Sequence, residues 1–158
     1  MIWILLAMAL IIGGSVISSV YNSKLKNDGR ISERKKNFAE YKEVFSAHGI
    51  SRDRLAEVFR SSEFRTNTKT EVTCSSESVS FRADGCFSAV LRTVQTADAE
   101  SVFEFGFVDW VGSYGSPSFP NEMNALVTAV ERVMLELDPA TKISLTKNDL
   151  AEKKLLFR

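Results

Sequence analysis

The sequence predicts an α+β fold: a membrane anchor, then a soluble domain in which helices pack on an antiparallel sheet. Residues 1–23 carry no charged side chain, apolar residues then recur with a helical period, and from residue 68 the period changes to two. The expected order is a single transmembrane helix, a helical hairpin, a sheet of about four antiparallel strands, a packed C-terminal helix and a short helical tail. We divide the chain into an anchor (1–23), a basic juxtamembrane linker (24–31) and a soluble domain (32–158).

The N-terminal segment has the length and composition of a transmembrane helix. Residues 2–12 form an unbroken apolar run, and apolar residues continue among small ones to residue 21. At about 1.5 Å per residue this segment spans roughly 30 Å, the thickness of a bilayer core. Aromatic rings near both ends suit the headgroup region. The residues that we assign to the anchor are Ile2, Trp3, Ile12, Gly13, Gly14, Ser18 and Tyr21.

A block of cations follows the apolar segment and predicts its orientation. The block consists of Lys24, Lys26, Arg30, Arg34, Lys35 and Lys36. Because lysine and arginine resist translocation, we expect a single-pass protein with its N-terminus outside and its soluble domain in the cytoplasm. The same cations would also attract an anionic leaflet, so a lipid-facing role is an alternative to a purely topological one.

A cleaved signal peptide is the main alternative to a retained anchor. Such a peptide has a basic region before its apolar run, and here only the terminal amine precedes it. Ser18 and Ser19 nevertheless resemble a weak cleavage region, and cleavage would give an exported domain. A buried soluble helix is disfavoured, because the run is terminal and is flanked by the basic block.

Small residues line one face of the predicted anchor. Ala9 and Gly13 are four residues apart, as are Gly14 and Ser18. This spacing lets two membrane helices approach closely. The pattern therefore predicts that the anchor pairs with another membrane protein or with itself, although small residues are also common in membrane helices that do not pair.

Two helices are expected at the start of the soluble domain. Phe38, Tyr41 and Phe45 recur at helical spacing and predict a helix over residues 33–47. Ser51 is expected to cap a second helix. The inner side of that second helix would be formed by Leu55, Val58 and Phe59.

Alternating side chains then predict strands over residues 68–75, 78–83 and 86–96. Residues 83–85 are expected to form a three-residue hairpin loop, with glycine supplying the left-handed conformation. This loop would set Phe81 opposite Phe87 and keep both rings on one face.

The fourth expected strand, residues 101–111, is the most hydrophobic. Strict alternation places Phe103, Phe105, Phe107 and Val111 on one face, and Val102, Glu104, Val108 and Trp110 on the other. A strand that is apolar on both sides is usually central in its sheet. Gly106 within it suggests close approach by another backbone.

The longest irregular stretch, residues 112–120, is a candidate partner-binding loop. Aromatic residues in a loop are typical of binding hot spots. The candidate residues are Asp109, Trp110, Gly112, Tyr114, Gly115 and Phe119. The alternative is a connector whose aromatic rings fold back on the core. An apolar stripe predicts a helix after this loop to about Leu137, then a short strand over residues 142–145 and a last helix opened by Thr146.

Side chains that could carry catalysis are sparse. The predicted register places Cys74 and Cys86 on opposite faces, which opposes a disulfide, and two cysteines with one histidine are too few for a zinc site. His48 is expected at a helix end with no nucleophile assigned to it. Glu104 and Asp109 would fall on opposite faces, so they could form an acid/base pair only if a bulge lay between them.

The charge distribution argues against nucleic acid as a partner. The formal net charge is zero, but after the basic block residues 37–158 hold 14 basic and 18 acidic side chains, a net charge of −4. A nucleic-acid binder needs the opposite sign. We expect a membrane-tethered, non-enzymatic protein-interaction module, such as an accessory, scaffold or inhibitor subunit at the cytoplasmic membrane face, with no cofactor or metal. The alternatives are a membrane-associated enzyme with a site near residues 109–119 and a sensor of anionic lipid surfaces.

Overall fold

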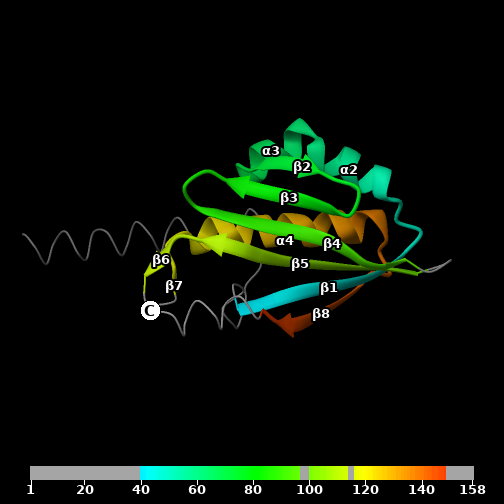
Figure 1. Cartoon of the computed structure of the whole chain (residues 1–158). Helices are drawn as coiled ribbons and strands as arrows, with labels where there is room; N and C mark the ends of the chain where they lie inside the picture. The colour runs from blue at the N-terminus through cyan, green and yellow to red at the C-terminus, as the bar shows by residue number, and fades with distance from the viewer. Residues whose placement is uncertain (1–39, 97–99, 114–115, 149–158) are drawn as a thin grey trace, which may run out of the picture. The chain divides into compact units, whose positions relative to one another are not determined.

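The computed structural model of the protein describes residues 40–96, 100–113 and 116–148 (Figure 1). They form a six-stranded antiparallel sheet with three helices, so the predicted α+β class is confirmed. The expected anchor, the basic block and the expected helical tail from residue 149 onward lie outside the described residues. Among the residues that are described, no helix is long and apolar enough to cross a membrane.

The main sheet has the strand order β2-β3-β4-β5-β1-β8, and every neighbouring pair is antiparallel. Its strands are β1 (Tyr41–His48), β2 (Glu71–Cys74), β3 (Ser78–Ala83), β4 (Phe87–Thr96), β5 (Glu100–Trp110) and β8 (Lys142–Lys147). The helices are α2 (Arg52–Arg60), α3 (Ser62–Thr68) and α4 (Pro120–Leu137). A separate two-stranded hairpin consists of β6 (Gly112–Ser113) and β7 (Ser116–Pro117).

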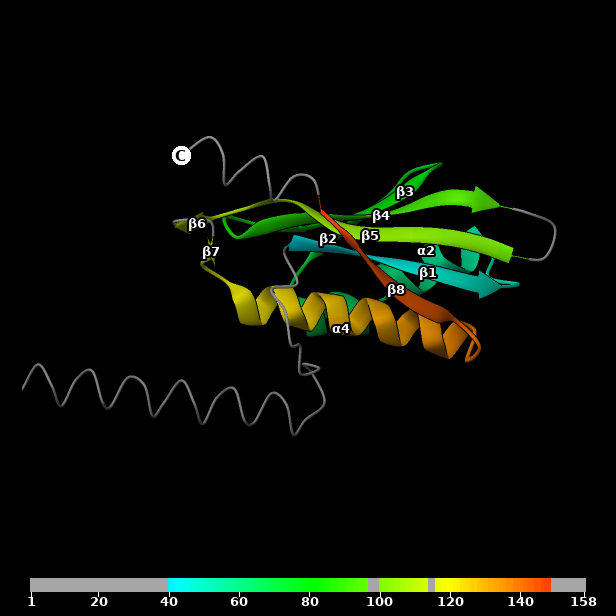
Figure 2. The ribbon, with the colours of Figure 1, turned by 90° about the horizontal axis from the view of Figure 1, so that it is seen from below.

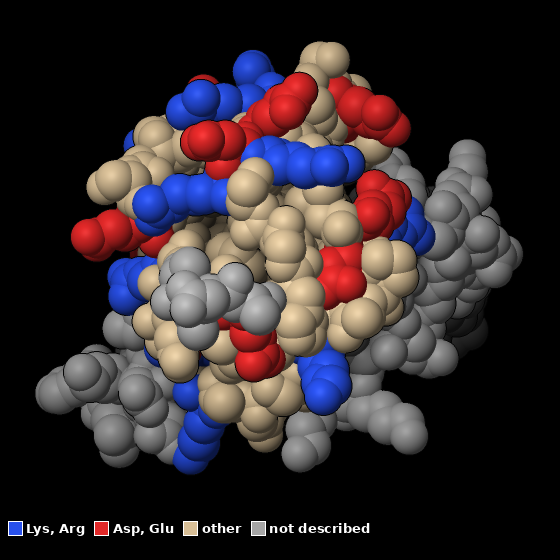
Figure 3. Space-filling view, turned by 90° about the vertical axis from the view of Figure 1, so that its right-hand side faces the viewer, with Lys and Arg blue, Asp and Glu red and all other residues tan. Residues whose placement is uncertain are grey.

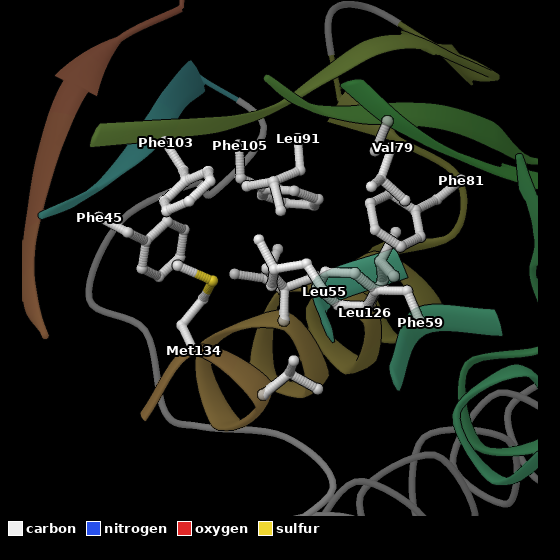
Figure 4. Close-up of a cluster of buried hydrophobic side chains, with 14 of the residues drawn as sticks. Phe45, Leu55, Phe59, Val79, Phe81, Leu91, Phe103, Phe105, Leu126 and Met134 are labelled. Carbon is white, nitrogen blue, oxygen red and sulfur yellow. The ribbon is translucent and has the colours of Figure 1, made fainter. Parts of the chain in front are cut away.

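The helices cover one face of the sheet, and the hydrophobic core lies between the two layers (Figure 2). Figure 4 shows Phe105 and Leu91 pointing from the sheet toward Leu126 of α4. Phe81 contacts Phe59 of α2 edge to face at a ring-centroid distance of 5.2 Å. Each fully buried side chain of this kind stabilises the fold by about 1.5–3 kcal/mol. No described helix covers the opposite face of the sheet.

The predicted helix over residues 33–47 is wrong where the structure describes it, because residues 41–48 form strand β1. Tyr41 and Phe45 fit a helical spacing, but burial alternates along β1 with a period of two, and Phe45 and Ala47 are fully buried. Two strands hydrogen-bond to β1, with β5 on one side and β8 on the other. These long-range partners override the local periodicity, and the predicted helical hairpin is replaced by a strand and two short helices.

The second predicted helix is confirmed and is divided in two. Ser51 caps α2 by accepting a hydrogen bond from Arg54 N, as expected, and Leu55 and Phe59 are buried. Ser61 then interrupts the helix and caps α3, because its hydroxyl accepts a hydrogen bond from Phe64 N.

The β3–β4 hairpin has the predicted loop length but a different register. The three loop residues are 84–86, and Phe81 lies opposite Ala89 instead of Phe87. The partner of each β3 residue is thus displaced by two residues along β4. Because this displacement is even, the same side chains face the core as predicted. Cys86 therefore lies in the turn and packs against the core, where the prediction placed it on the other face of a strand.

β5 is central, as its two apolar sides predicted, but a β-bulge changes its last residues. Ser88 pairs with Asp109 and Ala89 pairs with Phe107, so Val108 is the extra residue. The bulge turns Trp110 toward the core, where it is 8% exposed and opposite the buried Phe87. The predicted faces of Trp110 and Val111 are therefore wrong, and Val111 is 50% exposed.

The C-terminal helix α4 is confirmed over Pro120–Leu137, with Asp138 as its C-cap. The short strand expected over residues 142–145 extends to Lys147 as β8, so Thr146 lies within a strand and does not open a helix. Because β1 and β8 both join the sheet, it has six strands where about four were expected.

Candidate functional site

The predicted partner loop is more ordered than its composition suggested. Residues 112–113 pair with residues 116–117 as the β6–β7 hairpin, and Ser118 N donates to Val111 O at 2.9 Å. The hairpin leads directly into α4, whose N-cap is Phe119. The described residues of this stretch thus link β5 to α4 through a pair of short strands.

The described candidate residues of this loop differ in their exposure. Asp109 is exposed, whereas the indole of Trp110 is buried in the core. Gly112 and Phe119 are half-buried. Tyr114 and Gly115 lie outside the described residues, as do the proposed anchor residues and the six cations of the basic block.

The two carboxylates of β5 are placed on the same face by the bulge, which corrects the prediction of opposite faces. They are nevertheless five residues apart, which corresponds to roughly 15 Å along a strand. Glu104 Oε1 instead accepts from Lys42 Nζ at 3.1 Å. Glu104 and Asp109 therefore do not form an acid/base pair.

His48 serves a structural contact at the end of β1. Its backbone N–H donates to Asp138 Oδ2 at 2.8 Å, and its Nδ1 lies 3.8 Å from the same oxygen. The N–H of Ala140 donates to Asp138 Oδ1 at 2.9 Å. The hydrogen bonds from His48 N and Ala140 N hold the pKa of Asp138 below its usual value. This carboxylate joins the start of the α4–β8 turn to β1.

Cys74 and Cys86 are free thiols that are half-buried against the hydrophobic core. Within the described residues, no group of three or more His, Cys, Asp or Glu side chains could hold a metal ion.

A basic groove of about 490 Å³ is formed where α2, α3, β2 and β3 meet, and the sequence analysis did not identify it. Its lining residues with charged side chains are Arg60, Arg65, Lys69, Glu71, Arg82 and Asp84. Arg82 Nε pairs with Asp84 Oδ1 at 2.9 Å, and Arg82 lies opposite Glu71 in the β2–β3 pair. In the described part of the chain, no carboxylate lies within ion-pair distance of the other three cations. The groove therefore offers a site for a small anion.

The outer edge of β8 is the second feature that the sequence analysis missed. Every residue of β8 is exposed, and β8 is one of the two edges of the main sheet. Ile143 and Leu145 are 38% and 56% exposed, although they share the core face with the buried Phe45. An exposed edge with alternating apolar side chains is a template for another strand. The signal was present as the alternation of residues 142–147, which the sequence analysis assigned only in part to a strand.

On one face of the described domain (Figure 3), the basic side chains do not form a stripe. On the face shown in Figure 3, which looks onto the side of the molecule seen at the right in Figure 1, Lys and Arg side chains are interspersed with Asp and Glu. Such a mixed surface gives no continuous track for a phosphate backbone.

No protein-family model matches the chain, and neither a curated protein nor a solved structure matches it. The function is therefore inferred from the residues and their geometry.

Proposed function

We propose that the protein is a membrane-tethered, non-enzymatic interaction module that offers the edge of β8 to a protein partner. The tether is the apolar segment of residues 2–21, which is long enough to span a bilayer core. The observation that carries the binding role is the exposure of Ile143 and Leu145 on a sheet edge with which no other described strand pairs.

The chemistry of an edge strand supports a protein partner. Backbone N–H and C=O groups along an edge supply affinity to an added strand, and alternate side chains supply specificity. Here Ile143 and Leu145 provide the alternate apolar contacts. The lysines at both ends of β8, Lys142 and Lys147, restrict which strands can pair with it, because like charges directly opposite each other are destabilising. The edge is therefore suited to one selected partner.

Purification of the full chain in mild detergent tests this proposal. We expect wild-type protein to elute as an assembly larger than one chain, with its composition given by mass spectrometry. Leu145→Lys should release the partner, because it places a charge in the proposed contact. Val94→Lys is the matched control, since Val94 is also exposed (62%) but lies on another strand. A wild-type chain that elutes alone as a monomer would overturn the proposal.

Anion binding in the basic groove is a second candidate function. It is supported by Arg60, Arg65 and Lys69, which lie in the groove without a carboxylate partner among the described residues. Such binding would extend the predicted role as a sensor of anionic lipid surfaces from the basic block to the folded domain. We expect the full chain with all three replaced by Gln to bind soluble inositol phosphates more weakly than wild type at low salt. Equal binding would exclude the groove.

A further inference from the structure

We infer that the partner of β8 is the β8 strand of a second copy of this chain, paired antiparallel about Ser144. This inference rests on the proposed function, because it uses the same edge and names its occupant. The paired strands would join two six-stranded sheets into one continuous sheet around a two-fold axis.

The hydrogen-bond pattern shows which backbone groups of β8 face outward. Asn148 N donates to Glu40 O, and these two residues continue the β1–β8 register. In an antiparallel pair, residues alternate between facing the partner strand and facing away. The even-numbered residues of β8 therefore direct their backbone N–H and C=O groups to β1, while Ile143 and Leu145 direct theirs to the side that no described strand occupies.

Self-pairing about Ser144 matches these outward groups with one another. Ile143 of one copy lies opposite Leu145 of the other, as a hydrogen-bonded pair, and the two-fold axis repeats the contact. Both side chains then lie on the helix-covered side, as they do in the monomer. Each apolar side chain that is exposed on the edge thus meets an apolar side chain of the second copy.

The charges are compatible with the same register. Pairing about Ser144 places Lys142 opposite Thr146 and Lys147 opposite Thr141, so no lysine faces a lysine. Two alternatives with the same hydrogen-bond pattern are equally near. The one centred on Ile143 would place Leu145 opposite Thr141, which lies outside β8, and the other is centred on Leu145. The latter would place Ile143 opposite Lys147 and leave an apolar side chain facing a cation. Only pairing about Ser144 therefore sets both exposed apolar side chains of the edge, Ile143 and Leu145, opposite apolar side chains.

The two-fold arrangement also explains why a second copy is favoured over an unrelated strand. A contact in which the same edge serves both copies closes on itself and uses up both exposed β8 edges. Tethering both copies to one membrane raises their effective concentration. The small-residue face of the predicted anchor would allow the anchors to pair in the same dimer.

A cysteine at the proposed axis tests the inference in the full chain. In the paired strands, the two Ser144 residues form a non-hydrogen-bonded pair with Cα atoms about 4.5 Å apart, within the range of a disulfide. We expect Ser144→Cys in mild detergent to form a covalent dimer under mild oxidation, and a reductant to break this dimer. The yield of the covalent dimer should not fall on dilution over the range of protein concentrations in which the dimer persists. Wild type, which keeps Cys74 and Cys86, controls for the native thiols.

Two further variants fix the register. Lys142→Cys should not cross-link, because the two copies of residue 142 would be offset by four residues, about 13 Å along the strands. Leu145→Cys reports the alternative register. Absence of a Ser144→Cys dimer, equal cross-linking by Lys142→Cys, or faster cross-linking by Leu145→Cys would overturn the inference. If no dimer forms and a different protein co-purifies in a Leu145-dependent manner, the proposed function stands and only the identity of the partner is refuted.

Discussion

Individual residues at the corner where the described chain begins and ends carry specific stabilising contacts. Asn148 is fully buried, and its Nδ2 donates to Phe107 O at 3.1 Å, beyond the last β1–β5 pair at Glu43 and Phe105. The Asn148 side chain thus ties the end of β8 to the central strand β5. Without the Asn148 amide, the buried carbonyl of Phe107 would lose this hydrogen-bond donor.

Asn148→Ala is expected to lower the free energy of unfolding by about 1–3 kcal/mol, because it leaves a buried acceptor without its amide donor. Urea denaturation of the full chain in mild detergent measures the change. Thr146→Ala, at an exposed position of the same strand, should change stability by no more than about 0.5 kcal/mol. Equal effects of the two substitutions would show that the contact to Phe107 O contributes nothing specific.

Asp138 is expected to make stability depend on acid pH. Its hydrogen bonds from His48 N and Ala140 N favour the ionised carboxylate and lower its pKa in the folded state. The unfolded chain therefore takes up this proton first as the pH falls. The stabilisation is present above the unfolded pKa of about 3.9 and is lost as the pH falls through the lower folded pKa.

Thermal melting of wild type and Asp138→Asn from about pH 5 to about pH 2 tests this, since the range lies below the usual titration of histidine. We expect wild type to melt at a higher temperature at pH 5, and the difference between the two melting temperatures to shrink as Asp138 is protonated. A difference that stays constant over the range would contradict a role for the charge.

Gly106 has a steric reason to be glycine, although not the predicted one. A Cβ at this position would lie 2.9 Å from Lys42 Cγ, so a side-chain stem approaches it, where the sequence suggested another backbone. Lys42 lies over β5 with its Nζ on Glu104. Gly106→Ala should cost about 1–3 kcal/mol by overpacking. In a Lys42→Ala background the cost should nearly disappear, and a denaturation double-mutant cycle that gives additive effects would refute the contact.

At the scale of elements, α4 contributes one stripe of side chains to the helical side of the core. Leu126 is fully buried, whereas Leu135 on the same helix is 40% exposed. Leu126→Ala should destabilise the protein by about 2–5 kcal/mol, because it removes buried methyl groups and leaves a cavity. Leu135→Ala removes the same atoms from the surface and should cost less than about 1 kcal/mol. Similar denaturation midpoints for both variants would mean that the stripe is not the contact with the sheet.

The element patterns differ in how far local sequence determines them. The α4 stripe and the Ser51 cap involve neighbours along the chain, so the sequence predicted both. β1 could not be predicted in this way, because its identity depends on β5 and β8, which are distant in sequence. The bulge at Val108 was missed for the same reason: it is defined by pairing with Ser88 and Ala89, and alternation within one strand cannot reveal it.

At the scale of the whole molecule, membrane tethering stays a prediction from residues 2–21. Ile11→Arg together with Ile12→Arg places two charges near the middle of this segment, each at a cost of about 2.5–3.5 kcal/mol for insertion. We expect wild type to stay in the membrane pellet after alkaline carbonate extraction and the double variant to become extractable, with Ile11→Leu and Ile12→Leu as the control. The intact mass of purified wild type would show cleavage, if it occurs, and would then replace the anchor with a signal peptide.

The sequence by itself determined the α+β class, the second helix, the hydrophobic central strand and α4, because each depends on periodicity or capping within a short stretch. The tertiary structure decided that residues 41–48 are a strand, that Trp110 is buried and that Glu104 and Asp109 share a face without meeting. It also brought Arg60, Arg65 and Lys69 into one groove and left Ile143 and Leu145 on an open edge. These features depend on which strands pair and in which register. The local pattern of residues can indicate a strand, as the alternation of residues 142–147 does, but not its neighbours in the sheet.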